Sequence, residues 1–153
     1  MIRRTAQQIA DWYLAWADAL DAELDNLKLQ KLLYYTQGHA LREFGEPIFV
    51  DELQAWAHGP VVPSVYRRFK HAGSSSIEVD STLPSTFSWD DYRDVESFLQ
   101  RVWNSYAKYA SWTLREMTHR EPPWLEHFSE NERDAVIPVE ALRAHFTHDR
   151  AKQ

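Results

Sequence analysis

NLKLQKLLYYTQGHALREFG, residues 26–45, is the stretch of sequence that decides the fold. Asn26 suits the N-cap position of a helix, where its side chain would accept a hydrogen bond from a first-turn amide. Gly45 suits the other end, because glycine readily adopts the left-handed conformation that closes many helices. The apolar face at helical spacing consists of Leu29, Leu33, Thr36, Ala40 and Phe44. We therefore predict one helix over residues 26–44.

Gly38 lies inside this predicted helix. A glycine in a helix interior costs about 1 kcal/mol relative to alanine. The helix therefore needs a compensating reason to keep it, and we predict that another backbone approaches closely at this position.

The chain before residue 26 predicts a further helix that begins near Thr5. Thr5 and Gln8 have the spacing of a capping box, in which each side chain bonds an unpaired amide of the first turn. The apolar stripe that follows consists of Ile9, Trp12, Trp16, Leu20 and Leu24. We expect all five to be buried on one helix face.

The rest of the chain also favours helices. Pro63 fits a helix start, and Gly73 fits its end. Ser88 with Asp91 repeats the cap pattern before a stripe of Val95, Phe98, Leu99, Val102 and Tyr106. A helix over residues 112–118 is expected to stop at Pro122-Pro123, with a short one over 124–128. The last is expected to begin at Pro138 and to bury Val139, Leu142 and Phe146.

We therefore predict a mainly α fold, a compact single-domain bundle of about six helices over residues 1–150. Residues 74–87 are rich in serine and proline and predict a loop. The helical period breaks after Gly45, so a short β-hairpin near residues 48–57 stays open. His58-Gly59-Pro60 has the composition of a turn.

Composition narrows the class of function. The chain has 153 residues and a net charge of −6. It contains no cysteine, so a disulfide framework and a thiolate metal site are both excluded. It contains no phosphate-binding glycine loop and no HExxH pattern, so we expect no cofactor and no metal. No apolar run approaches the length of a membrane span, and no secretory signal is evident. We expect a soluble cytoplasmic protein with no membrane partner.

Four ordered blocks resemble the Panacea-domain antitoxin family, also described as SocA-like or phage-associated GepA-like. The blocks are KLQKLLYYTQG (28–38), GEPIF with ELQAWAHGPVVPSVY (45–66), LREMTHREPPW (114–124), and IPVEAL (137–142) followed by Phe146. The resemblance implies an antitoxin, rather than an enzyme, that binds and neutralises a cognate protein toxin encoded next to it. Delivery of the toxin to a protease is a variant that the resemblance also implies. The oligomeric state stays open.

Two groups of residues are candidates for partner binding. On the helix over 26–44, Lys28, Lys31, Tyr34 and Tyr35 lie off the leucine stripe and predict a basic, aromatic contact strip. A solvated face with tyrosine rings lying along it is the alternative. The second group is Trp56, His58, Gly59, Pro60, Tyr66, Arg67 and Arg68, which suits an aromatic and guanidinium hot spot. For Trp56 the alternative is a place in the core.

Two other classes of function stay open. Arg67, Arg68, Lys70 and His71 form a basic cluster that a nucleic-acid-binding regulator would use, although the acidic net charge makes nucleic acid an unlikely partner. An enzyme or small-ligand receptor would use His58 or His119. For His119, near the end of a predicted helix, a structural role at the helix terminus is the alternative.

Overall fold

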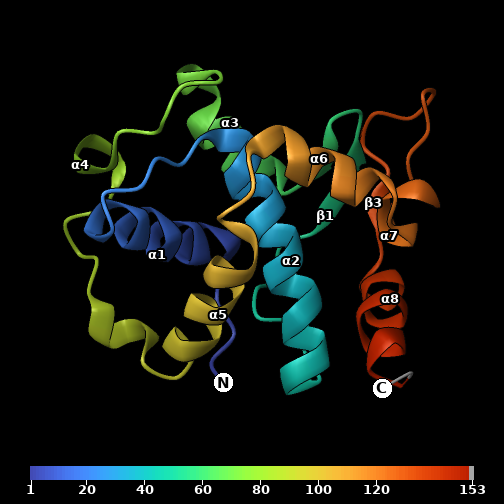
Figure 1. Cartoon of the computed structure of the whole chain (residues 1–153), viewed down its shortest axis with the longest axis horizontal. Coiled ribbons are helices and arrows are strands. Elements are labelled where there is room, and N and C mark those ends of the chain that lie inside the picture. Colours follow the sequence, from blue (N-terminus) through green and yellow to red (C-terminus); the bar gives the residue numbers. More distant parts are fainter. Residues whose placement is uncertain (152–153) are drawn as a thin grey trace.

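A computed structural model describes the backbone of residues 1–151 and the side chains of residues 1–147. The fold is mainly α, as predicted, and the described residues contain eight α-helices and a small three-stranded sheet. Figure 1 shows the helices gathered around α2 (Asn26–Phe44), which runs through the middle of the molecule. Against the predicted number of about six helices, α4 is an additional single turn within an expected loop, whereas α7 overlaps the short helix expected over residues 124–128.

Helix α2 has the predicted bounds but a different cap. Asp25, not Asn26, is the N-cap, and its carboxylate accepts the Lys28 amide at 2.8 Å. Asn26 instead donates from its side chain to the Tyr66 carbonyl at 3.1 Å. Gly45 closes the helix with φ of 77°, as expected. The helix contacts α1, α3, α5, α6, α8 and β2, so it is buried on nearly every side.

The reason for Gly38 differs from the prediction. The atoms nearest to a Cβ at this position belong to the phenyl ring of Phe146 from α8 (Val139–Ala151), a side chain and not a backbone. A Cβ at this position would lie 2.2 Å from the ring, which is far inside van der Waals contact. Glycine here therefore lets α8 pack directly against α2.

Helix α1 (Ala6–Ala19) has the predicted capping box between Thr5 and Gln8. Ile9 and Trp12 are fully buried, as expected. The predicted stripe fails at Leu20, which is 49% exposed because the helix ends at Ala19 and Leu20 is its C-cap. Leu24 is buried, but in the connection to α2 rather than on α1.

The β-hairpin lies further along the chain than residues 48–57. Strand β1 (Leu53–Trp56) pairs with β2 (Gly59–Val61) and, on its other edge, with β3 (Val136–Ile137), all antiparallel. Ala57 and His58 form the turn, and Gly59-Pro60 belong to β2. The turn predicted at His58-Gly59-Pro60 therefore lies one residue earlier. Gly59 has a positive φ of 113°, but it adopts this conformation as the first residue of β2.

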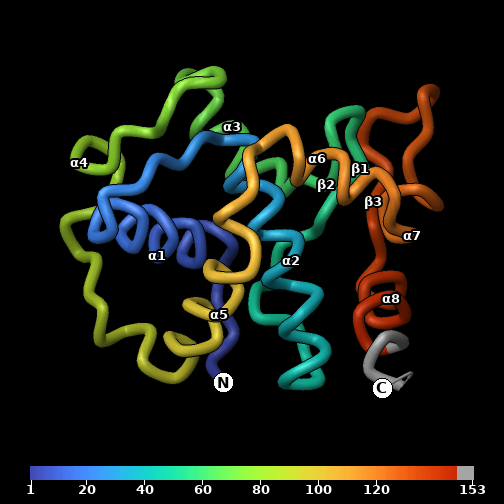
Figure 2. Tube along the Cα trace, viewed as in Figure 1, coloured from blue at the N-terminus to red at the C-terminus, as the bar shows by residue number. Residues whose placement is uncertain are grey.

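Helix α3 (Pro63–Phe69) begins at proline, as predicted, and continues as a 3-10 turn to Ala72. The loop expected at residues 74–87 contains α4 (Val79–Thr82). Ser88 caps a 3-10 turn, Trp89–Tyr92, instead of the long helix, and α5 follows as Glu96–Tyr106. Figure 2 traces this connection around the outside of α1.

The C-terminal part forms α6 (Ser111–His119), α7 (Pro122–Leu125) and α8. Pro122 opens α7 rather than only stopping α6, because proline is tolerated in the first helical turn. Leu142 and Phe146 are buried, whereas Val139 is 37% exposed, which corrects the prediction for that residue. No described helix is long and apolar enough to cross a membrane.

The contact at Gly38 gives a test of this packing. Gly38→Ala is expected to destabilise the protein by about 1–3 kcal/mol, because overpacking against Phe146 outweighs the helix-propensity gain of about 1 kcal/mol. The loss is expected to shrink in a Phe146→Leu background, where the ring is absent. Urea unfolding of the four proteins in a double-mutant cycle measures this coupling, and an equal loss in both backgrounds contradicts the proposed contact.

Candidate functional site

A groove of about 830 Å³ runs between the β1–β2 hairpin, α3 and the loop that precedes β3. Four residues of the second predicted group line it: Trp56, His58, Tyr66 and Arg67. The facing wall, residues 128–134, was not predicted. The groove is therefore the place where the structure brings separate segments together around the predicted hairpin residues.

Aromatic contacts hold the hairpin side of the groove. Trp56 is half-buried, which lies between the two predicted alternatives. Its ring meets Tyr66 edge-on with centroids 5.0 Å apart, and its indole N–H donates to Gln54 at 2.9 Å. His58 stacks on Tyr66 with centroids 5.6 Å apart. The three rings thus form a fixed aromatic floor.

The two walls of the groove carry opposite charge. Arg67 and Lys70 are exposed on the α3 side. Glu130, Glu132 and Asp134 are exposed on the facing loop, together with Arg133. Such a surface offers a partner both signs of charge around an aromatic centre.

The contact strip predicted on α2 is largely interior. Lys31 and Tyr34 are 0% exposed and Tyr35 is 1% exposed, so neither the strip nor the solvated face describes them. The Tyr34 hydroxyl donates to Glu121 Oε1 at 2.8 Å, and the Tyr35 hydroxyl donates to Glu121 Oε2 at 2.9 Å. One carboxylate therefore satisfies both phenols, and no spacing rule in the sequence pairs residues so far apart.

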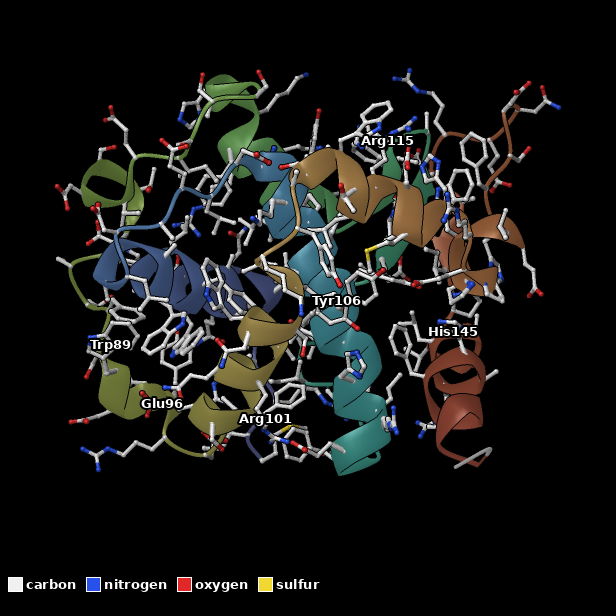
Figure 3. All side chains as sticks on the ribbon, viewed as in Figure 1. Trp89, Glu96, Arg101, Tyr106, Arg115 and His145 are labelled. Atoms are coloured by element: carbon white, nitrogen blue, oxygen red, sulfur yellow. The ribbon has the colours of Figure 1, made fainter. Side chains whose placement is uncertain are left out.

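Tyr35 also stacks on Tyr106 of α5, with centroids 3.9 Å apart and planes at 10°. Figure 3 shows Tyr106 between α5 and α2, where it is half-buried. The aromatic and carboxylate contacts of Tyr35 therefore connect α2 to both α5 and the α6–α7 junction.

Two further basic side chains that were predicted to bind a partner instead form contacts within the chain. Lys28 is half-buried and its ammonium donates to the Ala107 carbonyl, and burial lowers its pKa. Arg68 forms an ion pair with Asp11 at 2.7 Å and donates to the Thr82 carbonyl at 2.8 Å. Arg68 therefore fixes α3 against α1 and α4, while Arg67 remains on the surface.

Behind the hairpin turn, Lys31 donates from its ammonium to the Pro60 carbonyl at 3.0 Å. Gly59 lies against it: a Cβ there would come within 2.6 Å of Lys31 Cε. Desolvation, with a smaller contribution from the Arg115 charge, lowers the pKa of Lys31 to about 7. Gly59 and Pro60, both predicted as partner-binding, are buried and form this contact with α2.

Two glutamines that the sequence analysis missed also fix this segment. Gln30 accepts the Val62 amide at 2.9 Å. Gln37 accepts the Ile48 amide at 3.0 Å and donates to the Phe49 carbonyl at 2.9 Å. Both are buried polar side chains inside a helix, and neither belongs to the apolar stripe that the helical spacing picks out.

His58 and His119, the alternative catalytic candidates, are both half-buried. His119 stacks flat on Trp124 with centroids 3.9 Å apart. Neither has a nearby nucleophile in a hydrogen-bonded arrangement, and no cluster of three metal-binding side chains occurs in the part of the chain that the structure describes.

Comparisons with known proteins identify the protein family to which the chain belongs. The family model for the antitoxin SocA-like, Panacea domain matches residues 29–125, which include α2, the hairpin and α7. The chain therefore belongs to this family of antitoxins.

One curated protein is similar to this chain over most of its length. Antitoxin SocA of Caulobacter vibrioides (strain NA1000 / CB15N) is 32% identical over 127 residues, which cover 78% of this chain and 68% of the relative. The search of solved structures gave no significant match.

The buried lysine makes stability depend on pH. Because the folded pKa of Lys31, about 7, lies below the ordinary lysine pKa of 10.5, the unfolded chain binds more protons between these pH values. Stability therefore rises with pH in this window, with a contribution from Lys31 of up to about 1.4 kcal/mol per pH unit.

Lys31→Met keeps the length of the side chain and removes the titrating group. Urea unfolding of both proteins at several pH values between 7 and 9 is expected to show a shallower rise of stability in the variant. Identical slopes in the two proteins would show that Lys31 keeps an ordinary pKa in the fold.

Proposed function

We propose that this protein is a cytoplasmic antitoxin that neutralises a cognate protein toxin by direct binding, and that the groove between the hairpin, α3 and residues 128–134 receives the toxin. Family membership supports the antitoxin role. The observation that carries the choice of site is the aromatic floor of Trp56, His58 and Tyr66 between two charged walls.

The chemistry of the groove suits a protein partner. Tryptophan, tyrosine and arginine dominate the binding energy of many protein interfaces. Arg67 and Lys70 supply positive charge, but the facing Glu130, Glu132 and Asp134 would repel a phosphate backbone. A folded protein surface with charges of both signs matches this arrangement better than a nucleic acid does.

Inhibition without catalysis follows from this mode of binding. A toxin held in the groove would lose access to its substrate, or would be locked in an inactive conformation. Delivery of the bound toxin to a protease is compatible with the same docking surface, since the protein would then act as an adaptor. In each case the antitoxin supplies contacts and carries out no reaction.

Co-expression with the product of the adjacent gene tests the proposal. We expect the neighbour alone to stop growth and this protein to restore it, with the two proteins purifying as a complex. A neighbour that is harmless alone, or whose toxicity persists when this protein is present, would remove the antitoxin function.

Charge reversal in the same assay tests the site. Arg67→Glu is expected to weaken the complex by about tenfold to a hundredfold, because an exposed groove cation is replaced by an anion. Lys108→Glu is the matched control, since Lys108 is also exposed but lies outside the groove. Equal effects of the two substitutions would place the interface elsewhere while leaving the antitoxin function intact.

A further inference from the structure

Phe128 is the end ring of an aromatic stack at the wall of the groove. The Trp124 indole stacks on His119 with ring centroids 3.9 Å apart, and on Phe128 with ring centroids 4.7 Å apart. In the described part of the chain, Trp124 is the one ring that Phe128 contacts. One face of the Phe128 ring is therefore without an aromatic neighbour, on a half-buried residue that lines the groove.

The loop that follows Phe128 brings carboxylates into the same groove. The Glu132 amide donates to the Ser129 carbonyl at 3.2 Å, which folds the loop into a tight turn. The Ala55 amide of β1 donates to the Ala135 carbonyl at 2.8 Å and fixes the end of the loop to the sheet. Figure 1 shows this loop between α7 and β3, on the side of the molecule where β1 lies. Three exposed acids of the loop line the groove: Glu130, Glu132 and Asp134.

The charges on the two walls of the groove have no partner among the described residues. Elsewhere in the protein, ion pairs hold Arg4, Arg68 and Arg101 against acids. No ion pair of the described residues includes the charged side chains that line the groove, which are Arg67, Lys70, Glu130, Glu132, Arg133 and Asp134. Nor does any described cation lie over a ring of the groove. These charges are therefore available to a partner that brings charges of its own.

The sign of the charge changes across the groove. Arg67 and Lys70 make the α3 side positive. Behind the hairpin turn, the charges of Lys31 and Arg115 act in the same sense: after desolvation, they lower the pKa of His58 to about 4, so its ring is neutral at pH 7. The loop wall carries three carboxylates against one guanidinium. A cation of the partner is therefore favoured at the loop wall, and an anion is favoured at the α3 side.

We infer that the groove receives one segment of the toxin in a single orientation, with a basic side chain against Phe128 and the loop carboxylates and an acidic side chain toward Arg67 and Lys70. A cation is attracted to the face of an aromatic ring, and neighbouring carboxylates strengthen the attraction. The reversed segment would bring like charges together on both walls, so charge fixes the direction of the segment. This orientation rests on the proposed function, because the segment belongs to the toxin.

Charge reversal on each wall tests the orientation in the purified complex with the product of the adjacent gene. Glu132→Lys and Arg67→Glu are each expected to weaken the complex about tenfold or more. Both losses are expected to shrink at about 1 M salt, where exposed charges are screened. Glu126→Lys is the matched control for the loop wall, since Glu126 is exposed at the end of α7 and lies outside the groove.

Three outcomes would overturn the orientation. Tighter binding by Glu132→Lys would mean that the segment is acidic throughout, and tighter binding by Arg67→Glu would mean that it is basic throughout. A loss no larger than that of the control would mean that the segment does not enter the groove. The antitoxin function is tested separately, because it fails if the wild-type protein does not neutralise its neighbour.

A peptide titration of the full chain tests the position of the cation without the toxin. An acetylated and amidated Gly-Arg-Gly peptide at about 10 mM is expected to shift the ring signals of Phe128 in NMR spectra. The same peptide with citrulline, which has the shape of arginine without its charge, is expected to leave them in place. Glu132→Gln is expected to reduce the shift, and Glu126→Gln is expected to preserve it. Equal shifts with the two peptides, or no shift with either, would show that Phe128 receives no cation and would leave the antitoxin function intact.

Discussion

Hydrogen bonds from buried polar side chains of α2 to the backbone of residues 48–62 fix the rest of the structure. Gln37 bonds the amide of Ile48 and both backbone groups of Phe49, Lys31 bonds the Pro60 carbonyl, and Gln30 bonds the Val62 amide. A backbone group buried without a partner costs about 1–3 kcal/mol, so these bonds from α2, added to the strand pairing of β1 and β2, allow the segment to be interior. The position of the hairpin is therefore set by the helix.

The candidate groove depends on the same bonds. Trp56 and His58 belong to the hairpin, and the Trp56 carbonyl accepts the Trp124 indole N–H at 2.7 Å. That bond joins the hairpin to α7, next to the Glu121 carboxylate that holds Tyr34 and Tyr35. A hydrogen-bonded network in the interior thus determines where the groove lies on the surface.

The sequence predicted the helices well where local signals decide them. The capping box at Thr5, the left-handed Gly45 and the proline at the start of α3 are local features, and each was confirmed. The apolar stripe of α2 predicted one buried face, but a helix surrounded by neighbours buries polar side chains too. Periodicity records hydrophobicity and cannot show that a lysine or tyrosine will find a buried partner.

The candidate site was predicted only on its hairpin side. Trp56, His58, Tyr66 and Arg67 lie within one short stretch and do line the groove. The acidic wall at residues 128–134 has no motif, and its position follows from the pairing of β3 with β1. The charge of Arg115 similarly acts on Lys31 only because α6 packs against α2, a long-range contact that spacing rules do not contain.

The most direct test of the groove as the toxin-binding surface is amide hydrogen exchange, measured on this protein alone and in complex with its cognate toxin. The account predicts that toxin slows exchange in residues 56–70 and 128–134 and leaves the exposed connection at residues 78–91 unchanged. Protection confined to that connection, with the groove unaffected, would contradict it.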